Sequence, residues 1–386
     1  MNRDIDVMRL LAEARPAALD PDAGASARVL AAVMARAAAQ PRPAPARVRR
    51  RAALALGGAT AAIAAGLLAL LALQVVPASI PARVPVPAAP PATSARDVLL
   101  AAAQRPATGP ASGRYWRETT RTSSVLQTGE GAGAFLVEIG TQVDEWFAAS
   151  ASDRSWFISQ SLGGHPLTAA DEAAWRRAGS PDRFDVRVDK VGTVATATYD
   201  ARPGQPTGVP IDRQSGVFDL GRPGVSLTEL QQLPTDPSAL RARLVELRRR
   251  GDPAAATDAP KDVDPWLFQA AGSLLGAPVS PEVRSAALRL LADLPGVTNA
   301  GQVTDPLGRT GTAVAMTGTD PLSGTVQRQL VIEPATGRLL ASQTIVERPG
   351  TAEPWARPGL RISSVTTVQA GWTDETPPAV PPPGRG

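Results

Sequence analysis

Residues 52–76 read AALALGGATAAIAAGLLALLALQVV, and this run decides how the chain is divided. It contains no charged residue, and as a helix it would extend roughly 37 Å, more than the roughly 30 Å of a bilayer core. Several arginines stand just before the run, whereas the first charge after it is Arg83. This asymmetry predicts a single transmembrane helix with the N-terminus in the cytoplasm and the long C-terminal part outside.

Other interpretations of this run fit less well. A secretory signal has an apolar core of about 7–15 residues close to the N-terminus, whereas 51 residues come first here. A buried core helix of this length with adjacent arginines is rare in a soluble domain. Cleavage after the small residues at 77–79 is a further alternative. Gly58, Ala62 and Gly66 form a small-residue row of the kind that pairs helices, although such rows arise by chance in an alanine-rich run.

Composition excludes several classes of functional site. The chain has no cysteine and one histidine, His165, which rules out disulfides, thiolate sites and paired-histidine metal sites. His165 lies in Leu-Gly-Gly-His-Pro-Leu, a pattern that predicts a turn and favours a surface role over a catalytic base. Asp144 and Glu145 are neighbours in a predicted strand, so they should point to opposite faces. The sequence therefore predicts no enzyme, no metal site and no cofactor.

The positive charge is concentrated before the predicted span. Residues 1–51 carry ten arginines against five acidic residues, a net charge of +5, while the whole chain has a net charge of +4. Lysine occurs only at Lys190 and Lys261, so the abundance of arginine is typical of a GC-rich coding bias. The arginine cluster at 47–51 indicates topology and contact with anionic lipid. We expect a membrane contact and no direct nucleic-acid partner.

Residues 1–51 predict a cytoplasmic arm of two short helices followed by a proline-rich link. Apolar side chains recur at helical spacing but are too few to bury a core of their own. The arm is therefore either a disordered tether or a pair of amphipathic helices that folds onto a partner. The candidate partner-binding residues are Ile5, Met8, Leu11, Val29, Leu30 and Val33.

Beyond the span, six prolines in residues 77–92 predict a semi-rigid spacer, and residues 93–376 predict an extracytoplasmic α+β domain. Residues 377–386 are expected to be a disordered tail. We expect one continuous, curved antiparallel sheet with helices on its concave face, the alternative being two subdomains. Predicted helices cover 95–104, 168–177, 262–275 and 280–294, with another beginning at 236. Predicted strands cover 114–122, 134–148, 154–160, 183–188, 193–199, 297–303, 311–317, 326–332, 339–346 and 361–368.

All seven tryptophans lie after the predicted span. Core filling is sufficient to explain most of them. The more specific alternative is an apolar cavity lined by Trp116, Trp146 and Trp156, which a curved sheet would provide. A lipid or a lipoprotein would be the candidate ligand of such a cavity.

Four motifs carry a resemblance to a known family. They are MRLLAE at 8–13, LPTDPSALRARL at 233–244, ALRLLADLPGV at 287–297 and DPLGR at 305–309. On these motifs, and over nearly its whole length, the chain resembles a family of actinobacterial single-pass membrane proteins encoded beside extracytoplasmic-function sigma factors. Its exterior part is similar to the half-barrel of lipoprotein carriers and periplasmic sigma-factor regulators. The family supplies no catalytic residues, and the His and Cys ligands of zinc-type anti-sigma domains are missing from this arm.

The sequence thus leads to two hypotheses of function. The first is a membrane-anchored regulatory or sensor protein, anti-sigma-factor-like, whose exterior domain senses a ligand while its arm binds a cytoplasmic sigma factor or other regulator. The second is an anchored extracytoplasmic module that binds a lipid or a lipoprotein. The topology and the arm favour the first, and the tryptophans favour the second.

Overall fold

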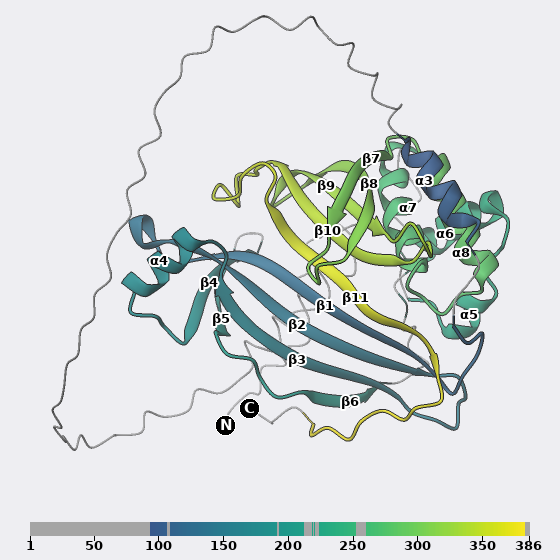
Figure 1. Cartoon of the computed structure of the whole chain (residues 1–386), viewed down its shortest axis with the longest axis horizontal. Coiled ribbons are helices and arrows are strands. Elements are labelled where there is room, and N and C mark those ends of the chain that lie inside the picture. Colours follow the sequence, from purple (N-terminus) through teal and green to yellow (C-terminus); the bar gives the residue numbers. More distant parts are fainter. Residues whose placement is uncertain are drawn as a thin grey trace, which may run out of the picture. The chain divides into compact units, whose positions relative to one another are not determined.

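The computed structural model describes residues 93–105, 109–190, 193–211, 218, 220, 224–251 and 260–382. The predicted arm, span and spacer lie outside these residues, as do the arm candidates Ile5, Met8, Leu11, Val29, Leu30 and Val33. Within the described part of the chain, no helix is both long enough and apolar enough to cross a membrane. The described residues form an α+β structure with a large antiparallel sheet (Figure 1).

The sheet of the described residues has eleven strands. The sequence predicted ten of them but missed the short β6, and it ended β1, β3 and β11 five or six residues too early. Alternating apolar and polar residues place one side of each long strand in the core, which is why these segments are strands. The strands are β1 (Tyr115–Thr128), β2 (Phe135–Ala148), β3 (Ser155–Pro166), β4 (Arg183–Lys190), β5 (Thr193–Asp200), β6 (Thr207–Ile211), β7 (Thr298–Thr304), β8 (Thr310–Asp320), β9 (Gly324–Ile332), β10 (Leu339–Arg348) and β11 (Arg361–Thr373).

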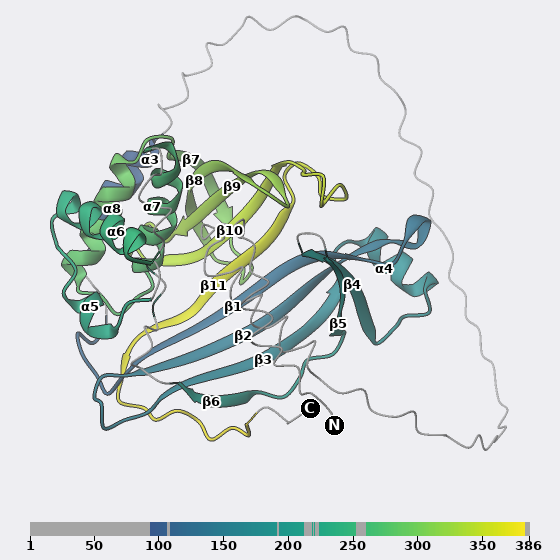
Figure 2. The same ribbon diagram turned by 180° about the vertical axis from the view of Figure 1, so that it is seen from behind.

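The two β-rich halves of the chain form one continuous sheet rather than two subdomains. The strand order is β6-β3-β2-β1-β11-β10-β9-β8-β7, and the β4–β5 hairpin joins the end of β1. The halves meet where the first strand pairs with the last, with Tyr115 opposite Thr373 and Trp116 opposite Trp372. Figure 2, which views the molecule from behind, also shows β11 running beside β1. The single sheet was the expected arrangement.

Most of the helices pack on one face of the β7–β9 part of the sheet. Their leucines form the main core with Val314 and Met316 of β8 and Leu330 and Ile332 of β9. Gly272 permits this close packing, because a Cβ atom there would lie 2.8 Å from a methyl carbon of Leu330. The helices are α3 (Ala95–Ala103), α4 (Ala169–Arg177), α5 (Leu227–Gln231), α6 (Pro237–Gly251), α7 (Pro260–Leu274) and α8 (Pro281–Asp293), of which α4 lies apart beside β2 and β3.

Helix starts follow the capping residues in the sequence. The side chains of Ser94 and Thr168 accept hydrogen bonds from backbone N–H groups three residues on, and an aspartate at each of those positions bonds back. The side chain of Ser280 likewise accepts a hydrogen bond from the N–H group three residues on, at the start of α8, before a proline at the first helical position.

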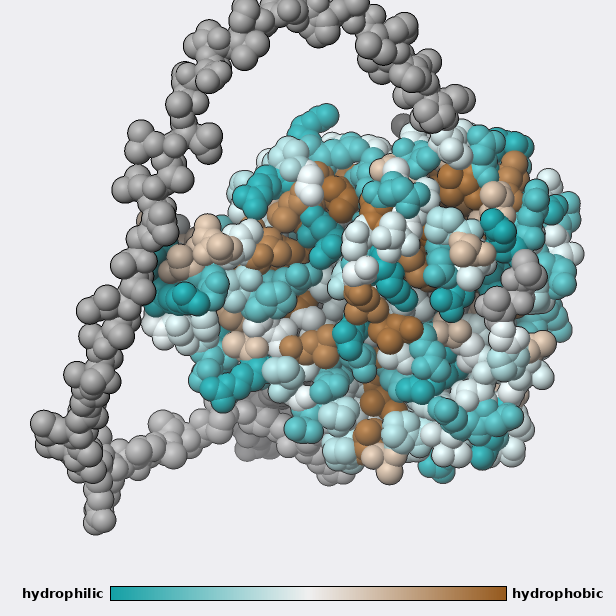
Figure 3. Space-filling view, in the orientation of Figure 1, coloured by the Kyte–Doolittle hydropathy of each residue, from teal (hydrophilic) through white to brown (hydrophobic). Residues whose placement is uncertain are grey.

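Figure 3 shows that hydrophobic residues on the face seen in Figure 1 form small patches separated by hydrophilic ones. This face therefore exposes no large continuous hydrophobic surface among the residues that the structure describes.

Residues 377–382, expected to be a disordered tail, lie against the sheet. The carbonyl oxygen of Pro381 accepts a hydrogen bond from the Gly208 N–H of β6 at 3.0 Å. Val380 packs on the apolar cluster of Tyr115, Trp146 and Ile158. The prolines of this segment disfavour helices and sheets but leave an extended segment free to dock. Residues 383–386 lie outside the described part.

We expect Val380→Ser to lower the free energy of unfolding by about 1–2 kcal/mol, because it removes a packed apolar side chain from the outer cluster. Ala379→Ser is the control, since Ala379 is exposed in the same segment. Chemical denaturation of the full chain measures both. Equal stability of the two variants would contradict the docking of the tail.

Candidate ligand-binding cavity

A cavity of about 600 Å³ separates the helical layer from the middle of the sheet. One wall is β11 from residue 367 to residue 372, together with Trp116 of β1. The opposite wall is the turn between α7 and α8 and the first two turns of α8, and a third wall is the start of β10. Val368 lines the cavity and is 40% exposed, so it marks where the cavity meets solvent.

Helix α8 presents one of its sides to this cavity because of its apolar pattern. Val283, Ala287 and Leu291 recur at helical spacing and are buried in the main core. Arg284 and Leu288, four residues apart on the adjoining side, line the cavity. The Ser285 hydroxyl donates to the carbonyl of Ala103 at 2.8 Å and ties α8 to the end of α3. Helix α8 is therefore held both by the main core and by the hydrogen bond to α3, and it carries Arg284 on the cavity wall.

Two residues of the cavity wall each carry a buried nitrogen atom that has no hydrogen-bond acceptor. They are Trp116, which is 5% exposed and has its indole Nε1 unpaired, and half-buried Arg284, which has its Nε unpaired. Burial lowers the pKa of Arg284 below its ordinary value, although an arginine remains protonated at neutral pH. The Trp116 ring meets Trp372 edge to face, with 5.5 Å between ring centroids. The residues of the wall therefore include two tryptophans in ring contact, and two of the wall residues carry a buried, unpaired donor atom.

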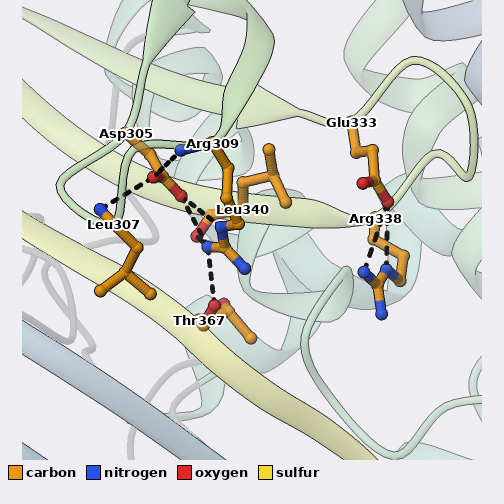
Figure 4. Close-up of polar contacts among 7 residues, drawn as sticks. All are labelled: Asp305, Leu307, Arg309, Glu333, Arg338, Leu340 and Thr367. Carbon is orange, nitrogen blue, oxygen red and sulfur yellow. Dashed lines mark hydrogen bonds and ion pairs between the residues drawn. The ribbon is translucent and has the colours of Figure 1, made fainter.

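Arg309, also on the cavity wall, is by contrast fully engaged (Figure 4). Its Nε donates to Asp305 Oδ2 at 2.7 Å, and its Nη2 donates to the carbonyls of Leu340 and Thr367 at 3.0 and 2.8 Å. Asp305 Oδ1 accepts the backbone N–H groups of Leu307 and Arg309, each at 2.9 Å. The DPLGR motif singled out in the sequence is thus a clip between the β7–β8 turn, β10 and β11.

A pair of glutamates lies beside the cavity. Glu118 of β1 is directly opposite Glu145 of β2, so both side chains point to the face that carries Trp116. A Cβ atom on Gly276, which lines the cavity, would lie 3.1 Å from Glu118 Oε1. Among the described residues, neither carboxyl group has a hydrogen-bond or ion-pair partner.

Burial and a neighbouring negative charge raise the pKa of both glutamates. Burial first, and then the charge of Glu145, raises the pKa of Glu118 to about 8. Burial first, and then the charge of Asp144, raises the pKa of Glu145 to about 7. Burial and a nearby negative charge each favour the protonated form of a carboxyl group. Sequence reasoning missed this pair, because only the strand register shows that Glu118 faces Glu145.

The three tryptophans proposed to share a cavity do not do so. Trp116 is opposite Phe147, and Trp146 is the neighbour of Phe147, so Trp116 and Trp146 point to opposite faces of the sheet. Trp146 is opposite Trp156 on that outer face and packs edge to face against Tyr115. The structure brings Trp146 and Trp156 together, and of these three tryptophans only Trp116 lines the cavity. The tryptophan that packs against Trp116 on the cavity wall is Trp372.

Asp144 and Glu145 point to opposite faces, as predicted. The Asp144 carboxylate accepts two hydrogen bonds from Arg117, both at 3.0 Å, and one from the Thr119 hydroxyl at 2.8 Å. The Arg117 guanidinium also stacks 4.5 Å from the ring centroid of Trp146. The Asp144 carboxylate is thus fully engaged on the outer face, which is typical of a structural network, although the buried Nε1 of Trp146 has no hydrogen-bond partner.

His165 lies in strand β3 rather than in the predicted turn. The strand continues through Gly163, which has a φ of +78° at an irregularity in the pairing with β2. The side chain of His165 is 69% exposed, and its Nε2 lies 3.8 Å from a carboxylate oxygen of Glu138. In the described part of the chain, no group of three or more His, Asp or Glu side chains is arranged to hold a metal ion.

Comparison with known proteins yields no matching family model and no matching curated protein.

Proposed function

We propose that this protein is a membrane-anchored sensor whose extracytoplasmic part binds a ligand and whose cytoplasmic arm binds a transcription regulator such as a sigma factor. The observation that carries the proposal is the cavity between α8 and β11. A hollow of about 600 Å³ with aromatic walls and a few unpaired polar groups has the size and chemistry of a small-molecule site. The proposal assigns no catalytic step to the chain.

The anchoring part of the proposal rests on the sequence. The uncharged run at 52–76 and the arginines before it support a cytoplasmic location for residues 1–51 and an exterior location for the sheet. In this proposal, the face that carries Trp116 is the ligand-binding face of the sheet. A ligand bound between α8 and β11 would link the helical layer to the sheet. The predicted span would be the covalent connection between this ligand-binding part and the arm.

The arm is tested in membranes of the source cell that contain the full chain. We expect a sigma factor to co-purify with the wild type and to be lost from the Leu11→Asp variant, because a charge on an apolar helix face prevents docking. Leu10→Asp is the matched control, since Leu10 lies on the opposite side of the predicted helix. Recovery of no sigma factor or other regulator with the wild type would refute the regulatory role.

A second function, carriage of a lipid or lipoprotein, is favoured by the apolar share of the cavity wall. Trp372, Leu288 and Leu339 line the same hollow as Trp116. In this case the purified chain should carry extractable lipid, detected by mass spectrometry, without any cytoplasmic partner. A chain that carries lipid but binds no regulator would favour this second function over the first.

A further inference from the structure

The chain that follows β11 crosses the outer face of the sheet. The Asp374 carboxylate accepts the backbone N–H of Arg114, just before β1, at 2.9 Å. The next residue, Glu375, accepts a hydrogen bond from Nη1 of Arg117 on the outer face of β1 at 3.4 Å. Residues 377–382 then reach the edge strand β6, and Figures 1 and 2 both show the segment passing beside β6. Polar contacts therefore lead the C-terminal segment across the outer face before it reaches the edge.

The last described residues of the chain lie on a surface formed by four strands. We call it the docking surface, and its residues are Tyr115 of β1, Trp146 of β2, Trp156 and Ile158 of β3, and Gly208 of β6. Val380 packs on this surface. A Cβ atom on Gly208 would lie 2.5 Å from a methyl carbon of Val380, so this contact requires glycine at that position. The docking surface thus accepts one branched apolar side chain.

Edge strand β6 offers one backbone donor to a segment that lies beside it. The N–H groups of alternate residues in an edge strand point away from the sheet, and the bond to Pro381 shows that Gly208 is such a residue. Pro206 and Pro210, two residues to either side, have no N–H. A regular strand would therefore pair poorly here, whereas a polyproline segment is stable without a ladder of hydrogen bonds. The chemistry of this edge favours a proline-rich occupant.

We propose that the docking surface is a binding site for extended, proline-rich peptides that contain a Val-Pro unit, and that residues 377–382 occupy it in cis. The valine packs on the apolar residues, and the carbonyl of the following proline accepts from the Gly208 N–H. Proline-rich segments bind aromatic surfaces at a low entropic cost because they are already extended. This site goes beyond the proposed sensor function and does not depend on it.

The occupant in cis is held lightly enough to be displaced. Four of the six residues in 377–382 are exposed, and Val380 is only partly buried. The chain also contains a second segment with the same unit, since the predicted spacer carries Val84-Pro85 and Val86-Pro87. Residues 41–46, PRPAPA, are proline-rich but contain no valine. These two sequences supply a positive and a negative probe of the Val-Pro requirement.

The test is a titration of the full chain, in a nonionic detergent, with the peptide PPAVPPPG of residues 377–384. The peptide has no aromatic residue, so tryptophan fluorescence reports on the protein alone. The Val380→Ser chain should bind the peptide saturably and about ten-fold more tightly than the wild type does, because the wild-type segment competes in cis. The Ala379→Ser chain is the control and should bind like the wild type, since Ala379 is exposed.

Variants of the peptide test the same contact without changing the protein. Serine in place of the peptide's valine should weaken binding to the Val380→Ser chain about ten-fold. The spacer peptide RVPVPAAPP should bind to this chain, and PRPAPA should bind much more weakly.

A second substitution in the Val380→Ser chain assigns the site to the docking surface. Gly208→Ala should weaken peptide binding about ten-fold or more, because its Cβ atom occupies the place of the valine. Gly204→Ala is the matched control, since a Cβ atom there would meet Ser161 at an ordinary 3.6 Å.

Several results would overturn the proposal. One is the lack of saturable binding to the Val380→Ser chain up to about 5 mM peptide, above the millimolar effective concentration typical of a tethered segment. Equal affinity of the wild-type and Val380→Ser chains, or equal effects of Gly208→Ala and Gly204→Ala, would also overturn it. Equal binding of the valine and serine peptides would overturn the Val-Pro requirement. The proposed sensor function stands in each of these cases, because it is tested by co-purification of the regulator with the arm.

Discussion

Replacing Asp305 with alanine is expected to lower the free energy of unfolding by about 3–5 kcal/mol, the range for breaking a buried ion pair from one side. The Asp305 side chain is fully buried and holds Arg309 together with two backbone N–H groups. Without the carboxylate, those donors and a half-buried charge lose their partner. Arg309 would then hold the carbonyls of Leu340 and Thr367 less firmly, and the β7–β8 turn would separate from β10 and β11.

Asp320→Ala is the matched control for this prediction. Asp320 also sits at a turn between two strands, accepts the N–H groups of Leu322 and Ser323, and faces an arginine, Arg328, at 3.6 Å. Its side chain is 21% exposed, so water can replace part of what is lost, and we expect a smaller decrease of about 1–2 kcal/mol. Denaturant titration of both variants gives the comparison. If Asp305→Ala loses no more stability than Asp320→Ala, the clip does not hold the sheet together as described.

Stability of the wild type is expected to decrease as the pH rises from about 5 to about 8, because of the glutamate pair. The folded-state pKa values, about 8 for Glu118 and about 7 for Glu145, lie above the ordinary value of 4.5. The folded chain therefore binds these protons more tightly than the unfolded chain does. Their stabilising effect is complete below pH 4.5 and is lost as the pH rises through 7 and 8.

Glu118→Gln should remove most of this pH dependence, because glutamine keeps the shape and cannot ionise. At pH 9 we expect the variant to be more stable than the wild type by about 2–4 kcal/mol, with little difference at pH 5. Glu138→Gln is the control, since Glu138 lies on the same strand as Glu145 but faces the guanidinium of Arg361 and the imidazole of His165. Unfolding curves at several pH values decide the matter, and a wild-type stability that is flat between pH 5 and 9 would contradict the raised pKa values.

The element types and most element boundaries could be predicted because their signals are local. Ser94, Thr168 and Ser280 cap helices that begin where the sequence indicated. The apolar alternation in 134–148 produced strand β2 almost to the residue. Each of these signals lies within about one turn of helix or one strand, and tertiary contacts reinforce rather than override it.

The site could not be predicted because it depends on register between distant strands. A shift of one residue in the β1–β2 pairing would move Trp116 and Glu118 to the outer face, where Trp146 lies. Nothing near these residues in the sequence specifies that choice. The partner of Trp116 on the cavity wall, Trp372, lies on the last strand of the sheet, so the grouping of Trp116 with Trp146 and Trp156 by proximity in the sequence was wrong.

The pairing of β1 with β11 has a consequence for how the protein is made. Until residues 361–373 have been synthesised and have reached the sheet, the edge of β1 that β11 will cover stays open, although its other edge is already closed by β2. An open edge from Tyr115 to Ser124, ten residues long, is a site for pairing with other chains. Contacts so far apart along the chain also slow folding. An intermediate with this edge open is therefore prone to aggregate until the last strand arrives.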